Sequence, residues 1–150
     1  MLSLTSKYAM RAVICLTQLA DESPVSGKCI AERASIPPKY LSKILGDLVR
    51  CGVLVSTRGK KGGFRLARPP TKISLHDVLA PFEAALVTPR TCPFGNMTCS
   101  DENPCLGHDE WKKVLERYTT FLSRTSIHHV AVSKRVRPGR GPAKRRSKTK

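Results

Sequence analysis

The sequence of 150 residues predicts a mostly α-helical protein with a small β wing, a winged helix-turn-helix followed by a long dimerisation helix. Three observations predict this fold. Two short amphipathic helices are joined by the tight turn SIPP, and a basic, glycine-rich hairpin follows them. After a cysteine-containing loop, apolar residues recur at spacings of three and four along one further helix.

The first helix is predicted by LTSKYAMRAVICLTQLA, which places Tyr8, Ala12, Cys15 and Leu19 on one face. We expect Thr5 or Ser6 to be its N-cap. The segment SPVSG breaks the chain, and Ser26 is suited to cap the short helix that follows.

The next helix is expected to recognise DNA. Pro37 and Pro38 suit its start, and Gly52 is placed to close it. Its apolar face consists of Leu41, Ile44, Leu45, Leu48 and Val49. The residues expected at the major groove are Lys39, Tyr40, Ser42 and Lys43.

The hairpin VLVSTRGKKGGFRLA reads as strand, turn and strand, with Arg58, Lys60 and Lys61 at the turn. We expect these three side chains to contact phosphate or the minor groove, while the turn glycines allow a close backbone approach. The alternative is an ordinary hairpin whose basic side chains are only solvated.

Charge is distributed unevenly. The net charge is +16, with +9 over residues 1–72, −2 over residues 73–132 and +9 over residues 133–150. Basic segments at both ends favour a polyanionic partner, here double-stranded DNA. We therefore predict a DNA-binding domain over residues 1–72, a cysteine loop with dimerisation helices over 73–132, and a disordered basic tail over 133–150.

The loop CPFGNMTCSDENPCLGH holds Cys92, Cys99, Cys105 and His108 in the pattern C-x6-C-x5-C-x2-H. No apolar run is long enough to span a membrane, and the first residues lack a secretory signal core. We therefore expect a cytoplasmic protein, in which a structural disulfide is disfavoured. Three cysteines and one histidine suit a closed zinc site or an iron–sulfur cluster, and the residues alone leave both open.

The chain resembles the bacterial iron–sulfur and nitric-oxide regulators typified by IscR, NsrR and RirA over about residues 1–130. The resemblance is carried by LTSKYAMRA, IPPKYLSKIL, RGKKGGFRLARPPTKISLHDV and the cysteine triplet. It implies a homodimeric transcription regulator, a repressor, whose DNA affinity is set by an iron–sulfur cluster bound by the four loop residues. The ending CLGH favours a 2Fe-2S over a 4Fe-4S cluster, although the first cysteine interval is one residue longer than in that branch. The alternative is a zinc-stabilised DNA-binding module without redox sensing.

The long helix that follows the loop is predicted to join two chains. Trp111, Val114, Tyr118 and Phe121 lie on one stripe of it, together with Leu115 and Leu122. Such a stripe suits packing against the same helix of a second copy across a two-fold axis. Nothing in the sequence supplies an oxyanion site or a substrate pocket, so we expect neither an enzyme nor a small-molecule substrate.

Overall fold

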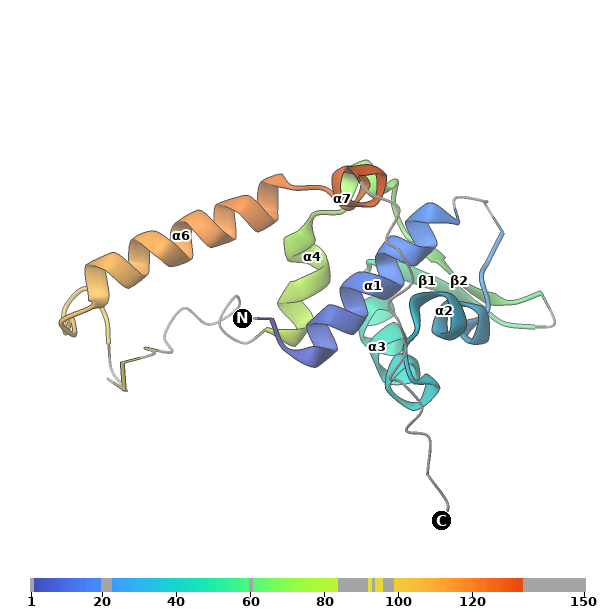
Figure 1. Ribbon diagram of the computed structural model, residues 1–150, viewed down its shortest axis with the longest axis horizontal. Helices are drawn as coiled ribbons and strands as arrows, with labels where there is room; N and C mark the ends of the chain where they lie inside the picture. Colours follow the sequence, from blue (N-terminus) through green and yellow to red (C-terminus); the bar gives the residue numbers. More distant parts are fainter. Residues whose placement is uncertain are drawn as a thin grey trace, which may run out of the picture.

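The computed structural model describes residues 2–19, 23–59, 61–83, 92, 94–95 and 99–133. It is mostly helical, with one two-stranded antiparallel sheet, as the sequence predicts. A body of short helices carries the hairpin on one side, while one long helix projects from the other side (Figure 1). No helix among these described residues is both long and apolar enough to cross a membrane.

Helix α1, Leu4–Gln18, lies at the centre of the body and packs against α2, α3, α4 and α7. Its N-cap is Ser3, whose side chain accepts a hydrogen bond from the backbone N–H of Ser6. The expectation of Thr5 or Ser6 was therefore wrong. Ser6 is instead fully buried inside the first turn, where its hydroxyl accepts a hydrogen bond from Ser3.

Helices α2, Gly27–Ala34, and α3, Pro38–Arg50, form the helix-turn-helix. Ser26 caps α2 by accepting from the backbone N–H of Cys29. Between the two helices Ser35 adopts a left-handed conformation with φ of 50°, which reverses the chain within a few residues. The apolar face of α3 is buried at the four positions Leu41, Ile44, Leu45 and Leu48.

The wing consists of β1, Leu54–Thr57, and β2, Gly63–Leu66, with Leu54 opposite Leu66 and Thr57 opposite Gly63. Val25 adds a short third edge, since its N–H and C=O both bond to Phe64 at 2.9 and 2.8 Å. A Cβ on Gly63 would lie 2.4 Å from the carbonyl oxygen of Val25. This glycine is therefore required by the protein's own backbone and not by an approach to DNA alone.

The chain after the wing forms a short helical turn, η1 (Pro70–Lys72), and then α4, Leu75–Leu79. Ser74 and Asp77 form a capping box at the start of α4, with bonds of 3.1 and 3.0 Å. Helix α4 ends before Pro81, which lies in the turn η2 (Ala80–Phe82).

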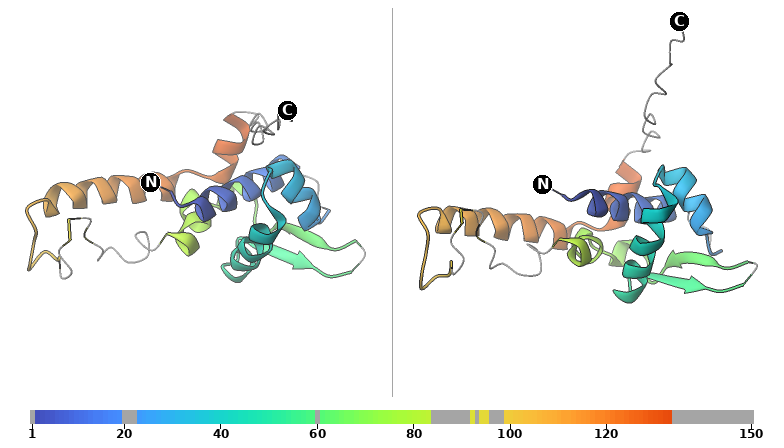
Figure 2. Two further views of the ribbon diagram at one scale, coloured as in Figure 1. Left: turned by 60° about the horizontal axis from the view of Figure 1, so that its bottom comes forward. Right: turned by 90° about the horizontal axis from the view of Figure 1, so that it is seen from below.

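Helices α6, His108–Arg124, and α7, Ile127–Ser133, complete the described chain. Only the C-terminal end of α6 contacts the body, and Leu122 is its one buried residue among those described. The rest projects as a rod with the cysteine loop at its far end, opposite the wing (Figures 1 and 2).

Glu83 joins the start of α1 to the segment that leads into the cysteine loop. Its carboxylate accepts a hydrogen bond of 2.7 Å from the backbone N–H of Ser3. Burial raises the pKa of Glu83, but hydrogen bonds from Ser6 and Ser3 lower it by more, so that the pKa lies below its usual value. The ionised carboxylate therefore stabilises the fold.

Replacing this carboxylate tests the link. We expect Glu83→Gln to lower the free energy of unfolding by about 0.5 kcal/mol at neutral pH, the contribution of an anion at a helix N-terminus. Because the pKa is depressed in the fold, the stabilisation is complete above the unfolded value of about 4.3 and is lost as pH falls further. Melting temperatures measured across this range should converge for variant and wild type. The exposed Glu32→Gln is the control, and a difference that persists at low pH would contradict this role.

Candidate metal centre and nucleic-acid interface

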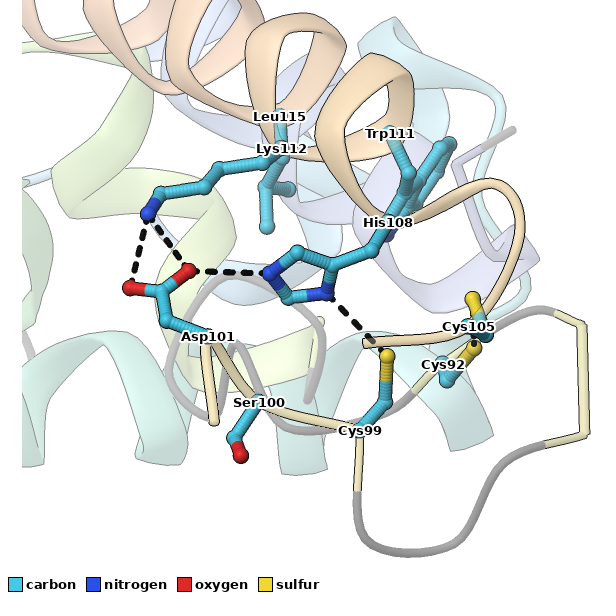
Figure 3. Close-up of a pocket in the computed structure, with 9 residues that line it drawn as sticks. All are labelled: Cys92, Cys99, Ser100, Asp101, Cys105, His108, Trp111, Lys112 and Leu115. Carbon is cyan, nitrogen blue, oxygen red and sulfur yellow. Dashed lines mark hydrogen bonds and ion pairs between the residues drawn. The ribbon is translucent and has the colours of Figure 1, made fainter. Parts of the chain in front are cut away.

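The structure brings together the sulfur atoms of Cys92, Cys99 and Cys105, which all lie within 4.8 Å of one another. The Sγ atoms of Cys92 and Cys105 are 3.5 Å apart. His108 joins this group through Nδ1, which lies 3.1 Å from Sγ of Cys99 (Figure 3). The four residues are separated by up to sixteen positions in sequence, yet they line one pocket together.

The loop and α6 position these side chains in different ways. His108 is the first residue of α6, and its backbone N–H donates to the carbonyl of Cys105 at 3.0 Å. The N-cap of α6 is Gly107, where an added Cβ would lie 2.6 Å from the ring of Phe94. Phe94 therefore packs directly on the Gly107 backbone. Behind the ligands, Trp111 and Leu115 of α6 supply an apolar wall.

The electrostatics of the group favour a thiolate at Cys99. A backbone hydrogen bond from Cys105, followed by the side-chain bond from His108, lowers the pKa of Cys99 to about 7. Burial, by contrast, raises the pKa of the Cys105 thiol. Hydrogen bonds to Asp101 and then to Cys99 raise the pKa of His108. Since metals bind thiolates, the lowered pKa of Cys99 prepares this thiol for a metal.

Sequence reasoning missed two residues of this pocket. Asp101 lies 2.9 Å from Nε2 of His108, and its carboxylate also accepts two hydrogen bonds from Lys112, at 2.7 and 2.8 Å. Lys112 follows His108 by four residues on α6, so the two side chains share a face of the helix. That spacing was visible in the sequence, but the position of Asp101 depends on the loop conformation.

The other three cysteines lie outside this group. Cys15 is buried in α1, and burial is the main reason that its pKa is raised. Cys51 is exposed at the C-cap of α3. Cys29 is half-buried in α2. Among the described cysteines, only the triplet of the loop forms a potential metal group.

The side chains expected to contact DNA lie on the surface of the helix-turn-helix and wing. Those that the structure describes are all exposed: Lys39, Tyr40, Ser42, Lys43, Arg58 and Lys61. Lys60 lies outside the described residues, as does the basic tail from residue 134 onward. Ser42 donates a hydrogen bond of 3.2 Å to the carbonyl of Pro38, within its own helix.

Contacts between helices fix the orientation of the exposed α3 surface. The rings of Tyr8 in α1 and Tyr40 in α3 lie 6.3 Å apart at an angle of 46°. The guanidinium of Arg11 lies 5.8 Å from the Tyr8 ring and donates to the carbonyls of Ala34 and Ser35 at the end of α2. Arg11 thus joins α1 to the end of α2, a role that no local sequence signal indicated.

A helix-turn-helix with a basic wing, followed by a long exposed helix, defines a winged-helix DNA-binding regulator. The family model described as Rrf2, iron-dependent transcriptional regulator, matches residues 2–133. This chain therefore belongs to the Rrf2 family of transcriptional regulators, as the resemblance in its sequence predicts.

Individual relatives agree with this assignment. The chain is 31% identical over 137 residues to the HTH-type transcriptional regulator IscR of Aliivibrio salmonicida, covering 90% of this chain and 80% of that protein. It is 42% identical over 85 residues to a putative HTH-type transcriptional regulator of Synechocystis, covering 57% of this chain and 58% of that one. Among solved structures, T. potens IscR matches with a TM-score of 0.68 and 27% identity, over 87% of this chain and 85% of that one.

Proposed function

We propose that this chain is a cytoplasmic, homodimeric transcriptional repressor whose DNA affinity is controlled by an iron–sulfur cluster. The cluster ligands would be Cys92, Cys99, Cys105 and His108. The observation that carries the proposal is the convergence of three sulfur atoms within 4.8 Å, with a histidine nitrogen 3.1 Å from one of them. In a chain of an iron-dependent regulator family, this donor set is of the type that binds iron.

The donor set fits such a cluster chemically. Cysteine thiolates are the usual ligands of iron–sulfur clusters, and a histidine in place of one thiolate raises the reduction potential. When bound, the cluster would supply a redox-active and ligand-exchangeable iron centre. The protein's own residues would hold it: Cys99 offers a thiol poised to ionise, and Trp111 with Leu115 shields one side from water. The resemblance of the ending CLGH to the IscR-like branch favours 2Fe-2S over 4Fe-4S.

Zinc is the second candidate, because the distances between the cysteine sulfur atoms also suit a zinc ion. A tetrahedral zinc ion with Zn–S bonds of about 2.3 Å separates its sulfur ligands by roughly 3.8 Å. The separation of 3.5 Å between Cys92 and Cys105 is compatible with such an ion. A zinc-stabilised DNA-binding module would share the fold and the family but would have no redox response.

The arrangement of the elements suggests a separate role for each half of the chain. We propose that residues 1–72 bind DNA and that residues 73–132 hold the cluster and join the two chains. The supporting observation for the dimer is the exposed apolar face of α6, where Val114 is 54% and Phe121 55% exposed. Tyr118 lies between these two residues, and the half-buried Trp111 extends the face toward the cysteine loop. A large exposed apolar stripe on a projecting helix is typical of a protein interface.

Anaerobic purification with iron, sulfide and zinc assays tests the metal centre. We expect iron and sulfide in the wild type with a visible absorption band, and loss of that band in Cys99→Ser. His108→Ala should retain a more labile cluster, since one of four ligands is removed. Cys51→Ser, outside the group, should behave like wild type. If the protein instead contains stoichiometric zinc and no sulfide, and still binds DNA, the cluster proposal is wrong and the zinc-stabilised module is favoured.

The wing is tested by the salt dependence of DNA binding. Arg58→Ala with Lys61→Ala should weaken binding to all sequences and reduce the slope of log K against log salt by about two, because each lost phosphate contact removes about 0.9. Binding is measured by fluorescence anisotropy at several salt concentrations. Lys113→Ala on α6, far from the wing, serves as the control. Unchanged affinity and slope would remove the wing from the interface.

The dimer is tested by a charge on the apolar face of α6. Phe121→Asp places a carboxylate in the interface twice, once from each chain, and should give monomer or aggregate by light scattering. Thr120→Asp introduces the same charge at an exposed position about 100° around the helix and should leave the dimer intact. A soluble and fully dimeric Phe121→Asp protein would contradict this assignment of the interface.

A further inference from the structure

Asp101 occupies a position between His108 and Lys112 that the metal site as proposed does not use. Its Oδ1 atom lies 2.9 Å from Nε2 of His108 and 2.7 Å from Nζ of Lys112, while Oδ2 lies 2.8 Å from the same Nζ (Figure 3). These contacts join the loop to the first two turns of α6. On the opposite side of the ring, Nδ1 faces the sulfur of Cys99.

The contact fixes which ring nitrogen carries a proton. An ionised carboxylate has no hydrogen to donate, so Nε2 of His108 must be the donor and Asp101 the acceptor. Nδ1, on the side of the three cysteines, donates to Cys99 only while the ring carries two protons. When the ring binds a metal it gives up this second proton, and the lone pair then resides on Nδ1. The geometry therefore selects both the tautomer and the rotation of the imidazole.

The exposure of the residues shows why a third group is needed. The side chain of His108 is 15% exposed, whereas that of Asp101 is 72% exposed. A solvated aspartate in a loop has many conformations open to it, and exposed ion pairs stabilise little by themselves. Lys112 binds both carboxylate oxygens from a fixed place on α6, which limits the rotation of Asp101.

We propose that Asp101, held by Lys112, is a positioning residue that makes Nδ1 of His108 the ligand atom and strengthens its donation to the metal. This inference rests on the proposed function, because it presumes a metal centre at the loop. Carboxylates that accept the second N–H of a ligating histidine fix its orientation and raise its basicity. Among the described residues, Asp101 is the side-chain acceptor that lies at Nε2 of His108.

The first test compares two loop variants of the cluster-loaded protein. Asp101→Asn keeps the size of the side chain but weakens the acceptor, and Glu102→Gln makes the same change of charge one residue further on, at an exposed side chain. We expect Asp101→Asn to lose its cluster about tenfold to a hundredfold faster to a chelator, and to have a more positive midpoint potential. Glu102→Gln should match wild type in both measurements. If both variants change the rate of cluster loss and the midpoint potential equally, the effect of Asp101 is one of charge alone, and the proposal is overturned.

The second test needs no cluster. In metal-free protein with ¹⁵N-labelled histidine, NMR in alkaline buffer distinguishes the ring nitrogen that carries the proton. Every sample also carries Cys99→Ala, because a Cys99 thiolate would otherwise hold a proton at Nδ1. We expect the Nε2–H tautomer at His108 where Asp101 is present and a mixture of tautomers where Asp101→Asn is added. A mixture already found with Asp101 present would overturn the proposal, whether or not Asp101→Asn protein takes up a cluster.

The two tests separate the two inferences. If the wild type contains no iron and sulfide, the proposed cluster is refuted. The tautomer measured by NMR still tests whether Asp101 orients the His108 ring. If the cluster is present but ¹⁵N hyperfine coupling assigns its histidine ligand to Nε2, the cluster stands and the positioning role of Asp101 fails.

Discussion

The burial of α1 is the constraint on which the rest of the molecule depends. Ala9 and Ala12 are completely buried, and their small side chains let neighbouring helices approach the α1 backbone closely. Because α2, α3, α4 and α7 all pack against this one helix, α3 and the segments that lead to α6 share a single core. A displacement of α1 would therefore move the exposed surface of α3 and the base of α6 together.

The wing and the described part of the cysteine loop lie at opposite ends of the molecule, with this core between them (Figure 2). Backbone hydrogen bonds supply one physical connection. The N–H of Leu75 donates to Thr125 at 2.9 Å, and the N–H of Ile127 donates to Ile73 at 2.8 Å. They fasten the C-terminal end of α6 to the chain that follows the wing. Glu83 supplies a second connection, from the root of the cysteine loop to the first turn of α1.

Local signals predicted the elements that depend on neighbouring residues. The cap at Ser26, the proline start of α3 and the hairpin turn were all predicted, because each involves residues within a few positions of one another. The N-cap of α1 was not predicted. Three hydroxyl residues precede or begin that helix, and the choice of Ser3 is accompanied by a contact with Glu83, eighty residues away.

The same distinction applies to the candidate site. The spacing of the cysteines and His108 indicated a metal group, since few other roles concentrate these residue types in one polar loop. The pattern contained no information on Asp101, whose neighbour Glu102 carries the same charge. The contact between Tyr8 and Tyr40 and the linking role of Arg11 were equally hidden, because they arise where three helices meet.

The composition of the loop explains why its ligands matter for its own structure. Apart from Phe94 on Gly107, the described loop residues bury little, and Leu106 is fully exposed at the tip. Helix α6 also begins at a glycine, without a side-chain cap. On the proposed function, a loop with so few apolar contacts would gain its order chiefly from the bonds between its ligands and the metal centre. Since His108 is both a proposed ligand and the first residue of α6, occupancy of the site and the order of this helix end would be joined in one residue.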